Sequence, residues 1–263
     1  MITALLLAAG SIAAQPHSQD RIQDRVLTHP EAAAIATGAP VAGQIIRLRG
    51  PSEGDITERP GSDGPLYSAG RVATDTKLPI GYPRPTPPGA VEVKHYGTVR
   101  QAEFSGSSDP RRASRSGFMP LFGHIQRNSI AMTAPVEMRF EDAPEPNGNG
   151  STEWTMAFLY HTEADGPTGR DGEVRVVDTE PLTVVALGVR GGRGFEDLGT
   201  ARAELEAVIA ENTQWTATGS VRMLGYNGPA TPVRDRWWEL QIPVSPAEQP
   251  AEPEAETDPN RTL

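Results

Sequence analysis

The chain has 263 residues, with 34 acidic residues against 24 Lys and Arg, and it contains no Cys. The formal net charge of −10 argues against a nucleic-acid-binding protein, because phosphate neutralisation requires a concentrated basic surface. The lack of Cys excludes disulfides, thiolate nucleophiles, Cys-ligated zinc and iron–sulfur clusters. The length suits one well-filled domain with tails.

The chain begins with an apolar run at residues 2–14, ITALLLAAGSIAA. This run is shorter than the about 20 residues that span a bilayer, and it ends in small residues that suit signal cleavage. We therefore expect residues 1–14 to be a signal peptide, the protein to be exported to the periplasm or secreted, and no segment to span a membrane. The alternative is a buried N-terminal helix.

Two further segments have compositions that do not favour a packed core. Residues 15–87 contain most of the ten prolines found between positions 30 and 88, which predicts a mostly irregular Pro-rich linker, with a short helix possible at 21–27. Residues 246–263 combine Pro and Ala with five acidic residues, which predicts a disordered acidic tail.

Residues 88–245 carry the periodic signals of a folded domain. Apolar residues alternate at every even position from Ile130 to Phe140, as in a strand, whereas Phe118, Leu121, Phe122 and Ile125 have helical spacing. The expected elements in chain order are strand 90–104, helix 110–127, strands 130–140 and 153–161, then strand 182–190, helix 195–211, and strands 219–226 and 236–243. This strand–helix–strand–strand order occurs twice, so we predict a duplicated α+β domain with mostly antiparallel strands.

The same periodicity assigns several polar side chains to the surface. Glu137 and Glu153 lie at the polar positions of their strands, so we expect both to be solvated. His124 lies off the apolar stripe of its helix, and His161 follows a strand before a turn. We expect both His side chains to be exposed.

Seven motifs, in order, resemble those of the SOUL/haem-binding protein family. They are VEVKHYGT, GFMPLFGHIQ, IAMTAPVEM, WTMAFLYH, RGGRGFEDL, MLGYNGPATP and WWEL, and the resemblance covers about residues 88–243. The resemblance implies a duplicated, distorted eight-stranded β-barrel flanked by two helices. It also implies non-covalent binding of haem or another tetrapyrrole as the cofactor.

The resemblance also implies which residues form the site. One group of the family carries a His proposed as an axial iron ligand, and the matching position here is His95, the candidate metal ligand. The alternative is a His at the edge of the core, bonded to the backbone or facing solvent. Other members hold the porphyrin in an apolar cleft beside the first helix, which corresponds to Phe118, Met119, Leu121, Phe122, Ile125 and Met132.

Two groups of residues near this cleft allow alternative interpretations. Residues 100–127 contain five Arg, at positions 100, 111, 112, 115 and 127, but only two acidic residues. Of these Arg, Arg115 and Arg127 are candidates for pairing with propionates. A solvated helix face is an equal alternative. Met119, Met132, Met138 and Met156 carry thioethers that can bind iron, but filling of the core is the favoured role.

We therefore expect a non-catalytic protein that binds, carries or buffers a small planar apolar ligand. Two alternatives remain: an enzyme acting on a tetrapyrrole or another small planar substrate, and a sensor barrel for apolar cations. The sequence contains no G-x-S-x-G motif for an acyl-transfer triad. A buried acidic residue in the cavity would favour cation sensing, and turnover of bound porphyrin would favour an enzyme.

Overall fold

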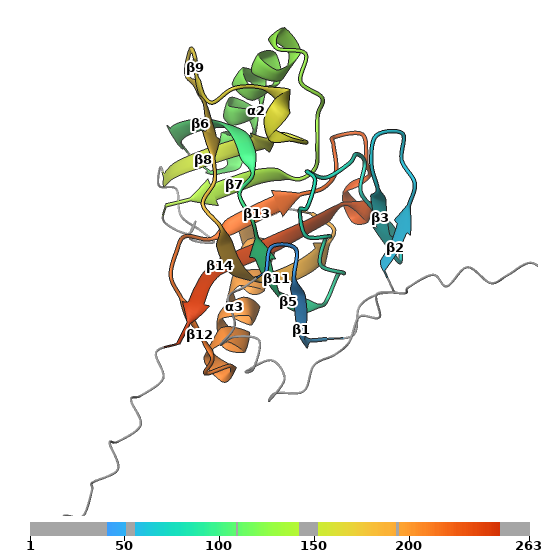
Figure 1. Ribbon diagram of the computed structural model, residues 1–263. Coiled ribbons are helices and arrows are strands. Elements are labelled where there is room, and N and C mark those ends of the chain that lie inside the picture. Colours follow the sequence, from blue (N-terminus) through green and yellow to red (C-terminus); the bar gives the residue numbers. More distant parts are fainter. Residues whose placement is uncertain (1–40, 51–55, 109, 142–151, 193–194, 248–263) are drawn as a thin grey trace, which may run out of the picture.

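The computed structural model describes residues 41–50, 56–108, 110–141, 152–192 and 195–247 (Figure 1). The predicted signal peptide, the possible helix at 21–27 and nearly all of the acidic tail lie outside these residues. Among the described residues, no helix is both long and apolar enough to cross a membrane.

The domain consists of two copies of one strand–strand–helix–strand–strand unit. The first copy contains β5 (Val91–Tyr96), β6 (Arg100–Ser108), α2 (Pro110–Arg127), β7 (Val136–Phe140) and β8 (Thr152–Leu159). The second copy contains β10 (Val174–Asp178), β11 (Leu182–Arg190), α3 (Phe195–Glu211), β13 (Arg222–Gly225) and β14 (Trp237–Pro246). The predicted duplication of an α+β unit is thereby confirmed.

The two copies form one antiparallel sheet in which they exchange their first strands. The order is β5-β11-β14-β13-β7-β8-β6-β10, so β5 pairs with β11 of the second copy and β10 with β6 of the first. Strand β7 pairs with β13 at the centre. Figure 1 shows α2 at the end of the molecule near β6 and α3 at the opposite end near β11 and β5.

Three short strands extend this sheet, and the expected distorted eight-stranded barrel is wrong. β1 (Ile45–Arg49) pairs with β5, β9 (Gly169–Asp171) with β10, and β12 (Trp215–Ala217) with β14, which gives eleven strands. The path runs from β1 to β9, and within the described chain these two edges are not paired with each other. The predicted strand 90–104 is also divided into β5 and β6, and β7 begins at Val136 rather than at residue 130.

Register separates the sheet into an apolar face and a polar face. Directly paired positions place one apolar row under the helices: Leu187, Leu240, Met223, Met138 and Met156. The neighbouring positions, which point the other way, include Glu239, Glu137 and Glu103. These three carboxylates are only 0, 2 and 4% exposed, so the expectation that Glu137 is solvated is wrong, whereas Glu153 is exposed as expected.

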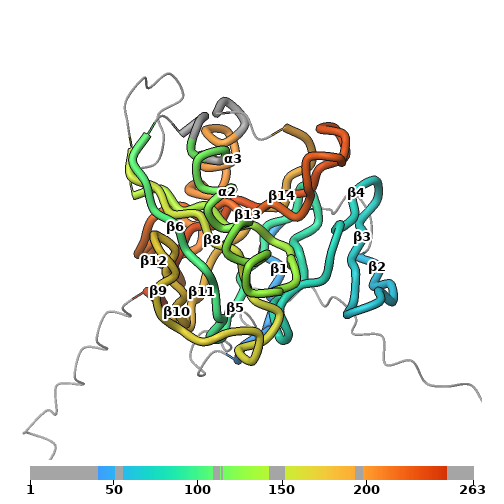
Figure 2. Tube along the Cα trace, turned by 90° about the horizontal axis from the view of Figure 1, so that it is seen from above, coloured from blue at the N-terminus to red at the C-terminus, as the bar shows by residue number. Residues whose placement is uncertain are grey.

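The polar face is buried because an N-terminal segment covers it. Residues 74–90, called here the strap, pack Leu78 and Tyr82 against Tyr96 and Leu224 of the sheet. A separate sheet of β2 (Ile56–Arg59), β3 (Leu66–Ala69) and β4 (Val72–Ala73) precedes the strap and lies to one side of the domain (Figure 2). Four strands thus occur within the segment that the sequence predicts to be mostly irregular.

A fully buried ion pair fastens the strap to the sheet. Lys94 Nζ donates to Glu239 Oε1 at 2.8 Å and to the carbonyl of Arg84 at 2.6 Å, while the Thr86 amide donates to the same Glu239 oxygen at 2.6 Å. Burial alone would raise the pKa of Glu239, but the Lys94 charge and these hydrogen bonds hold it below its ordinary value. The proline-rich strap is therefore an ordered part of the domain.

Candidate ligand-binding cleft

An open cleft of about 770 Å³ lies beside α2 on the apolar side of the sheet. Helix α2 forms one wall, and the other walls come from β7, β8, the end of β13 and residues 132–134. The strap and the loop after β13 complete the rim at Asp75 and at residues 227–229. The cleft has a volume typical of sites that enclose a ligand of drug size.

Two stacked aromatic rings on α2 form the helical wall. Phe118 and Phe122 are four residues apart, so both point from one side of the helix, and their ring centroids are 5.6 Å apart. Phe118 also packs against Phe158 in a T-shaped arrangement, with ring centroids 5.1 Å apart. Both rings line the cleft and are only partly buried. They offer a flat apolar surface to a ligand.

Methionine thioethers form much of the remaining surface. Met138 and Met156 are buried at the floor, whereas Met119 is 63% exposed at the rim and Met132 is partly exposed. All four side chains line the cleft, although the sequence favours core filling for each of them. Their flexible, polarizable side chains suit a surface that adapts to an apolar ligand.

Two of the motifs shared with the family, MTAPV and GYN, shape the rim through hydrogen bonds. In MTAPV, the Ala134 amide donates to the carbonyl of Lys77 at 2.8 Å. In GYN, Asn227 Nδ2 donates to Asp75 Oδ1 at 2.8 Å, and the amide of Gly228 donates to Asp75 Oδ2 at 2.7 Å. Both motifs therefore join the strap to the rim of the cleft, although they lie about 90 residues apart in the sequence.

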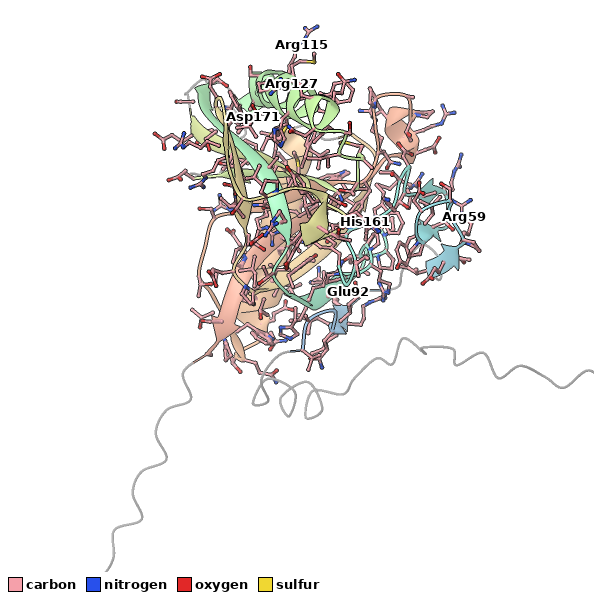
Figure 3. All side chains as sticks on the ribbon, turned by 45° about the horizontal axis from the view of Figure 1, so that its top comes forward. Arg59, Glu92, Arg115, Arg127, His161 and Asp171 are labelled. Carbon is pink, nitrogen blue, oxygen red and sulfur yellow. The ribbon has the colours of Figure 1, made fainter. Side chains whose placement is uncertain are left out.

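The candidate arginines are in different environments (Figure 3). Arg115 is exposed on α2 and lines the cleft. Arg127, at the end of α2, lies outside the lining and donates to Asp171 Oδ2 at 2.8 Å. Arg100 is bound to Asp178 at 2.8 Å, and the side chains of Arg111 and Arg112 lie outside the described part of the structure. Arg115 is therefore the arginine from this group that the structure places at the cleft.

Three other predicted site residues do not line the cleft. Leu121 and Ile125 are 0 and 4% exposed and pack in the core beneath α2. His95 is buried in the half of the sheet covered by α3, where its Nδ1 is 2.8 Å from Thr183 Oγ1 and its ring is 6.4 Å from that of Trp215. Burial lowers the pKa of His95. Its distance from the cleft follows from the exchange of β5 between the two copies.

The two histidines expected at the surface are hydrogen-bonded instead. His124 is 4% exposed, with Nδ1 2.7 Å from Asp171 Oδ2 and Nε2 2.8 Å from Tyr160 Oη. Hydrogen bonds from His124 and Arg127 lower the pKa of Asp171 to about 2. His161 is only partly exposed and contacts the carbonyl of Leu78 at 3.0 Å. These contacts fix α2 to β9 and the strap to β8, so both expectations of exposed His are wrong.

The described lining of the cleft fits a tetrapyrrole held by apolar contact. It offers aromatic rings, aliphatic chains and thioethers, with charged groups only at the rim. It contains no His, and the hydroxyl of Tyr226 is bound to Glu239 on the other face of the sheet, so the iron-binding side chains it offers are Met thioethers. Within the described residues there is also no cluster of three or more His, Cys, Asp or Glu suited to a metal ion.

Comparisons with known proteins give distant structural matches and one family. The C-terminal domain of EcmrR is 14% identical, with a TM-score of 0.49 over 59% of this chain and 96% of that domain. In the EcmrR–DNA complex, the chain spans only 57% of the EcmrR chain, at the same identity and TM-score. An uncharacterized conserved protein from Listeria innocua is 15% identical, with a TM-score of 0.45 over 58% of this chain and 92% of that one.

No curated protein matches the sequence. A family model does match it, over residues 84–243, which is more than half of the chain. These residues contain both helices, both copies of the repeated unit and most of the cleft. The chain belongs to the SOUL heme-binding protein family.

Proposed function

We propose that this protein binds haem or a related tetrapyrrole non-covalently in the cleft beside α2, as a carrier or buffer rather than as an enzyme. The observation that carries the proposal is the cleft of about 770 Å³, with stacked Phe118 and Phe122 on one wall and four Met side chains around them. Removal of apolar ligand surface from water contributes about 25 cal/mol per Å². A large flat macrocycle therefore gains affinity here without an axial bond.

The charged rim suits the carboxylates of a natural tetrapyrrole. Arg115 extends from α2 at the edge of the cleft and is exposed. A guanidinium pairs with a carboxylate through two parallel hydrogen bonds. In this arrangement the propionates face solvent at Arg115, and the macrocycle lies against the aromatic wall. Bound haem would supply an iron centre, and the protein would supply a dry apolar surface that shields it.

The rival proposal of an apolar-cation sensor requires an uncompensated buried carboxylate. The structure contains buried Glu103, Glu137 and Glu239, but they lie on the opposite face of the sheet from the cleft. Each is bound to Arg or Lys: Glu103 to Arg175, Glu137 to Arg222 and Glu239 to Lys94. Within the described chain these acids are neutralised, which favours a tetrapyrrole over a cation.

The test is titration of the full chain with haemin and with iron-free protoporphyrin, followed by the Soret band and by Trp fluorescence. Phe122→Ala should weaken both ligands about tenfold, because it removes one apolar wall. The matched control is Val233→Ala, which removes an apolar side chain that is 54% exposed and outside the cleft. Equal affinities for Phe122→Ala and the wild type would contradict the proposal.

Two further observations distinguish the alternatives. Because His95 does not line the cleft, His95→Ala should leave the Soret band of the haemin complex unchanged. Loss of porphyrin absorbance under reductant would instead indicate an enzyme. Residues 2–14 support export as a further proposal, which N-terminal sequencing of the mature protein tests.

A further inference from the structure

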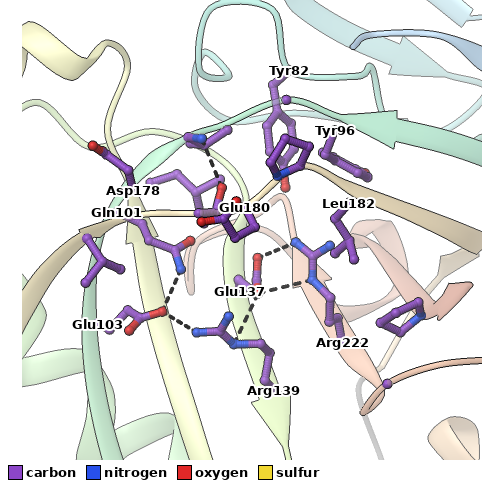
Figure 4. Close-up of a pocket in the computed structure, with 18 of the residues that line it drawn as sticks. Tyr82, Tyr96, Gln101, Glu103, Glu137, Arg139, Asp178, Glu180, Leu182 and Arg222 are labelled. Atoms are coloured by element: carbon purple, nitrogen blue, oxygen red, sulfur yellow. Dashed lines mark hydrogen bonds and ion pairs between the residues drawn. The ribbon is translucent and has the colours of Figure 1, made fainter. Parts of the chain in front are cut away.

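A second cavity, of about 590 Å³, lies on the polar face of the sheet and is separate from the cleft. It is lined by the end of β5, by β6, β7, β10 and β13, and by Tyr82 of the strap. We call it the polar pocket (Figure 4). None of its lining residues is shared with the cleft beside α2, so it is not explained by tetrapyrrole binding.

A chain of charged groups crosses this pocket, as Figure 4 shows. Arg222 Nε and Nη2 donate to the two oxygens of Glu137 at 3.1 and 2.6 Å. Arg139 lies between Glu137, at 3.5 Å, and Glu103, to which it also donates. Arg175 Nη2 donates to the other oxygen of Glu103 at 2.7 Å. Three guanidiniums thus face two carboxylates, which leaves this cluster with one excess positive charge.

Two buried donors in the pocket have no acceptor among the described protein atoms. They are the hydroxyl of Tyr82 and Nη1 of Arg222, in residues only 8 and 7% exposed. Burial raises the pKa of the Tyr82 phenol, so this side chain remains a neutral donor. A buried polar group without a partner is costly, and a ligand that supplies an acceptor removes that cost.

The remaining lining residues indicate which kind of ligand the pocket can accept. Val99, Val177 and Leu182 are partly exposed along its walls, so it accepts an apolar body. At the mouth, Asp178 is already bound by Arg100 at 2.8 Å. Glu180 lies in solvent, where salt screens its charge. The pocket therefore combines apolar walls with two buried donors that lack an acceptor, beside a cluster of three guanidiniums and two carboxylates.

We propose that the polar pocket binds a small organic carboxylate with an apolar body, whose carboxylate oxygens accept hydrogen bonds from Tyr82 Oη and Arg222 Nη1. A cation is disfavoured because the two buried carboxylates of the pocket, Glu103 and Glu137, are already bound by arginines. The site is independent of the proposed tetrapyrrole cleft, because the two cavities open on opposite faces of the sheet.

Three probes of equal size test the proposal on the full chain by calorimetry: 2-naphthoate, 2-naphthamide and 2-naphthylmethylammonium. We expect naphthoate to bind about tenfold more tightly than the amide, and the ammonium not to bind. Tyr82→Phe should weaken naphthoate about tenfold and leave haemin affinity unchanged. Because the hydroxyl has no protein acceptor, this variant should keep or raise the melting temperature, so that lost binding cannot reflect unfolding.

Two controls separate this site from the cleft. Tyr67→Phe, on β3 outside the pocket, should leave naphthoate affinity unchanged. Phe122→Ala should weaken haemin and leave naphthoate unchanged, so the two proposals fail independently. The proposal is overturned if naphthoate does not bind, because the Tyr82 and Arg222 donors would then be hydrogen-bonded to water instead of to a ligand. It is also overturned if the ammonium binds equally well, or if Tyr82→Phe binds naphthoate like the wild type.

Discussion

The two copies of the repeated unit share their buried helix residues but differ at two helix positions beside them. Leu121 and Ile125 of α2 correspond to Leu205 and Ile209 of α3, which lie 84 residues later, and all four are buried. At the same offset, Phe118 and Phe122 correspond to Arg202 and Glu206. The stacked rings of the first copy are thus replaced by an ion pair of 2.6 Å in the second.

The cavities beside the two helices also differ, in their volume. The cleft beside α2 has a volume of about 770 Å³, whereas the cavity beside α3, lined in part by Leu198, Gly199 and Arg202, has only about 20 Å³. Both helices pack on the sheet through equivalent buried residues, so the frame alone does not produce a cleft. A few substitutions at half-buried positions therefore decide which copy carries an open cleft.

The largest expected effect concerns a pair of equivalent positions at the centre of the sheet. Glu137 of β7 and Arg222 of β13 lie 85 residues apart, at matching places in the two copies, and they bind each other. Glu137→Leu should lower the free energy of unfolding by about 3–5 kcal/mol, because it leaves the buried Arg222 without its carboxylate. Urea denaturation measures this loss.

The double variant Glu137→Leu/Arg222→Met is the control for this prediction. It removes both charges, and the apolar replacement of a buried pair is often nearly neutral, so most of the lost stability should return. Equal stability of the single variant and the wild type would show that the two copies are not joined through this pair.

A double variant can give α2 the pair of residues that α3 carries at the equivalent positions. Phe118→Arg/Phe122→Glu should weaken haemin binding about 100-fold, because two apolar side chains of about 1.5 kcal/mol each are removed from the wall. The melting temperature should fall, because Phe118 also packs against Phe158, but the chain should remain folded, since α3 carries the same pair. Absorbance titration and thermal unfolding measure the two quantities.

The reverse exchange in the second copy tests whether the cleft is specific to α2. Arg202→Phe/Glu206→Phe should leave haemin affinity within about twofold of the wild type, since the cavity beside α3 has almost no volume. Tight haemin binding by Phe118→Arg/Phe122→Glu would contradict the assignment of the cleft as the site.

The sequence predicts the order of the elements and the duplication, because both depend on local periodicity. It fails for Glu137 because alternation distinguishes the two faces of a strand but does not say whether the polar face meets water. Here the strap covers that face, and the strap precedes the periodic segments.

The sequence likewise identifies some residues of the candidate site and misses others. Phe118, Met119, Phe122 and Met132 line the cleft, and the family resemblance, which rests on local motifs, is what points to them. His95 does not, because β5 pairs with the second copy, and such a long-range exchange leaves no local signal in the sequence. Tyr82 could not be predicted either, since it lies in a proline-rich segment without periodicity.

The third prediction concerns how closely each helix approaches the sheet. Gly117 of α2 corresponds to Ala201 of α3, and a Cβ at Gly117 would lie 2.9 Å from Trp154 Cζ3 and 3.0 Å from Met156 Cβ. Gly117→Ala should lower the free energy of unfolding by about 1–2 kcal/mol, because overpacking outweighs the gain in helix propensity.

Gly123→Ala, on the same helix, is the matched control for the third prediction. Its Cβ would meet only the flexible end of Arg127, at 3.2 Å, so this variant should be stabilised by about 0.5–1 kcal/mol. Stabilisation of both variants would show that α2 and α3 approach the sheet equally closely.

The smallest expected effect is at the rim, where Arg115 of the first copy corresponds to Gly199 of the second. Arg115→Gln should weaken haemin about two- to fivefold at low salt, since an exposed ion pair contributes about 0.2–1 kcal/mol. The effect should shrink in 0.5 M NaCl, because salt screens exposed charges. The dimethyl ester of protoporphyrin lacks both carboxylates, so its affinity should be equal for Arg115→Gln and the wild type. An equal loss for the ester would mean that Arg115 contributes packing at the rim and does not bind a propionate.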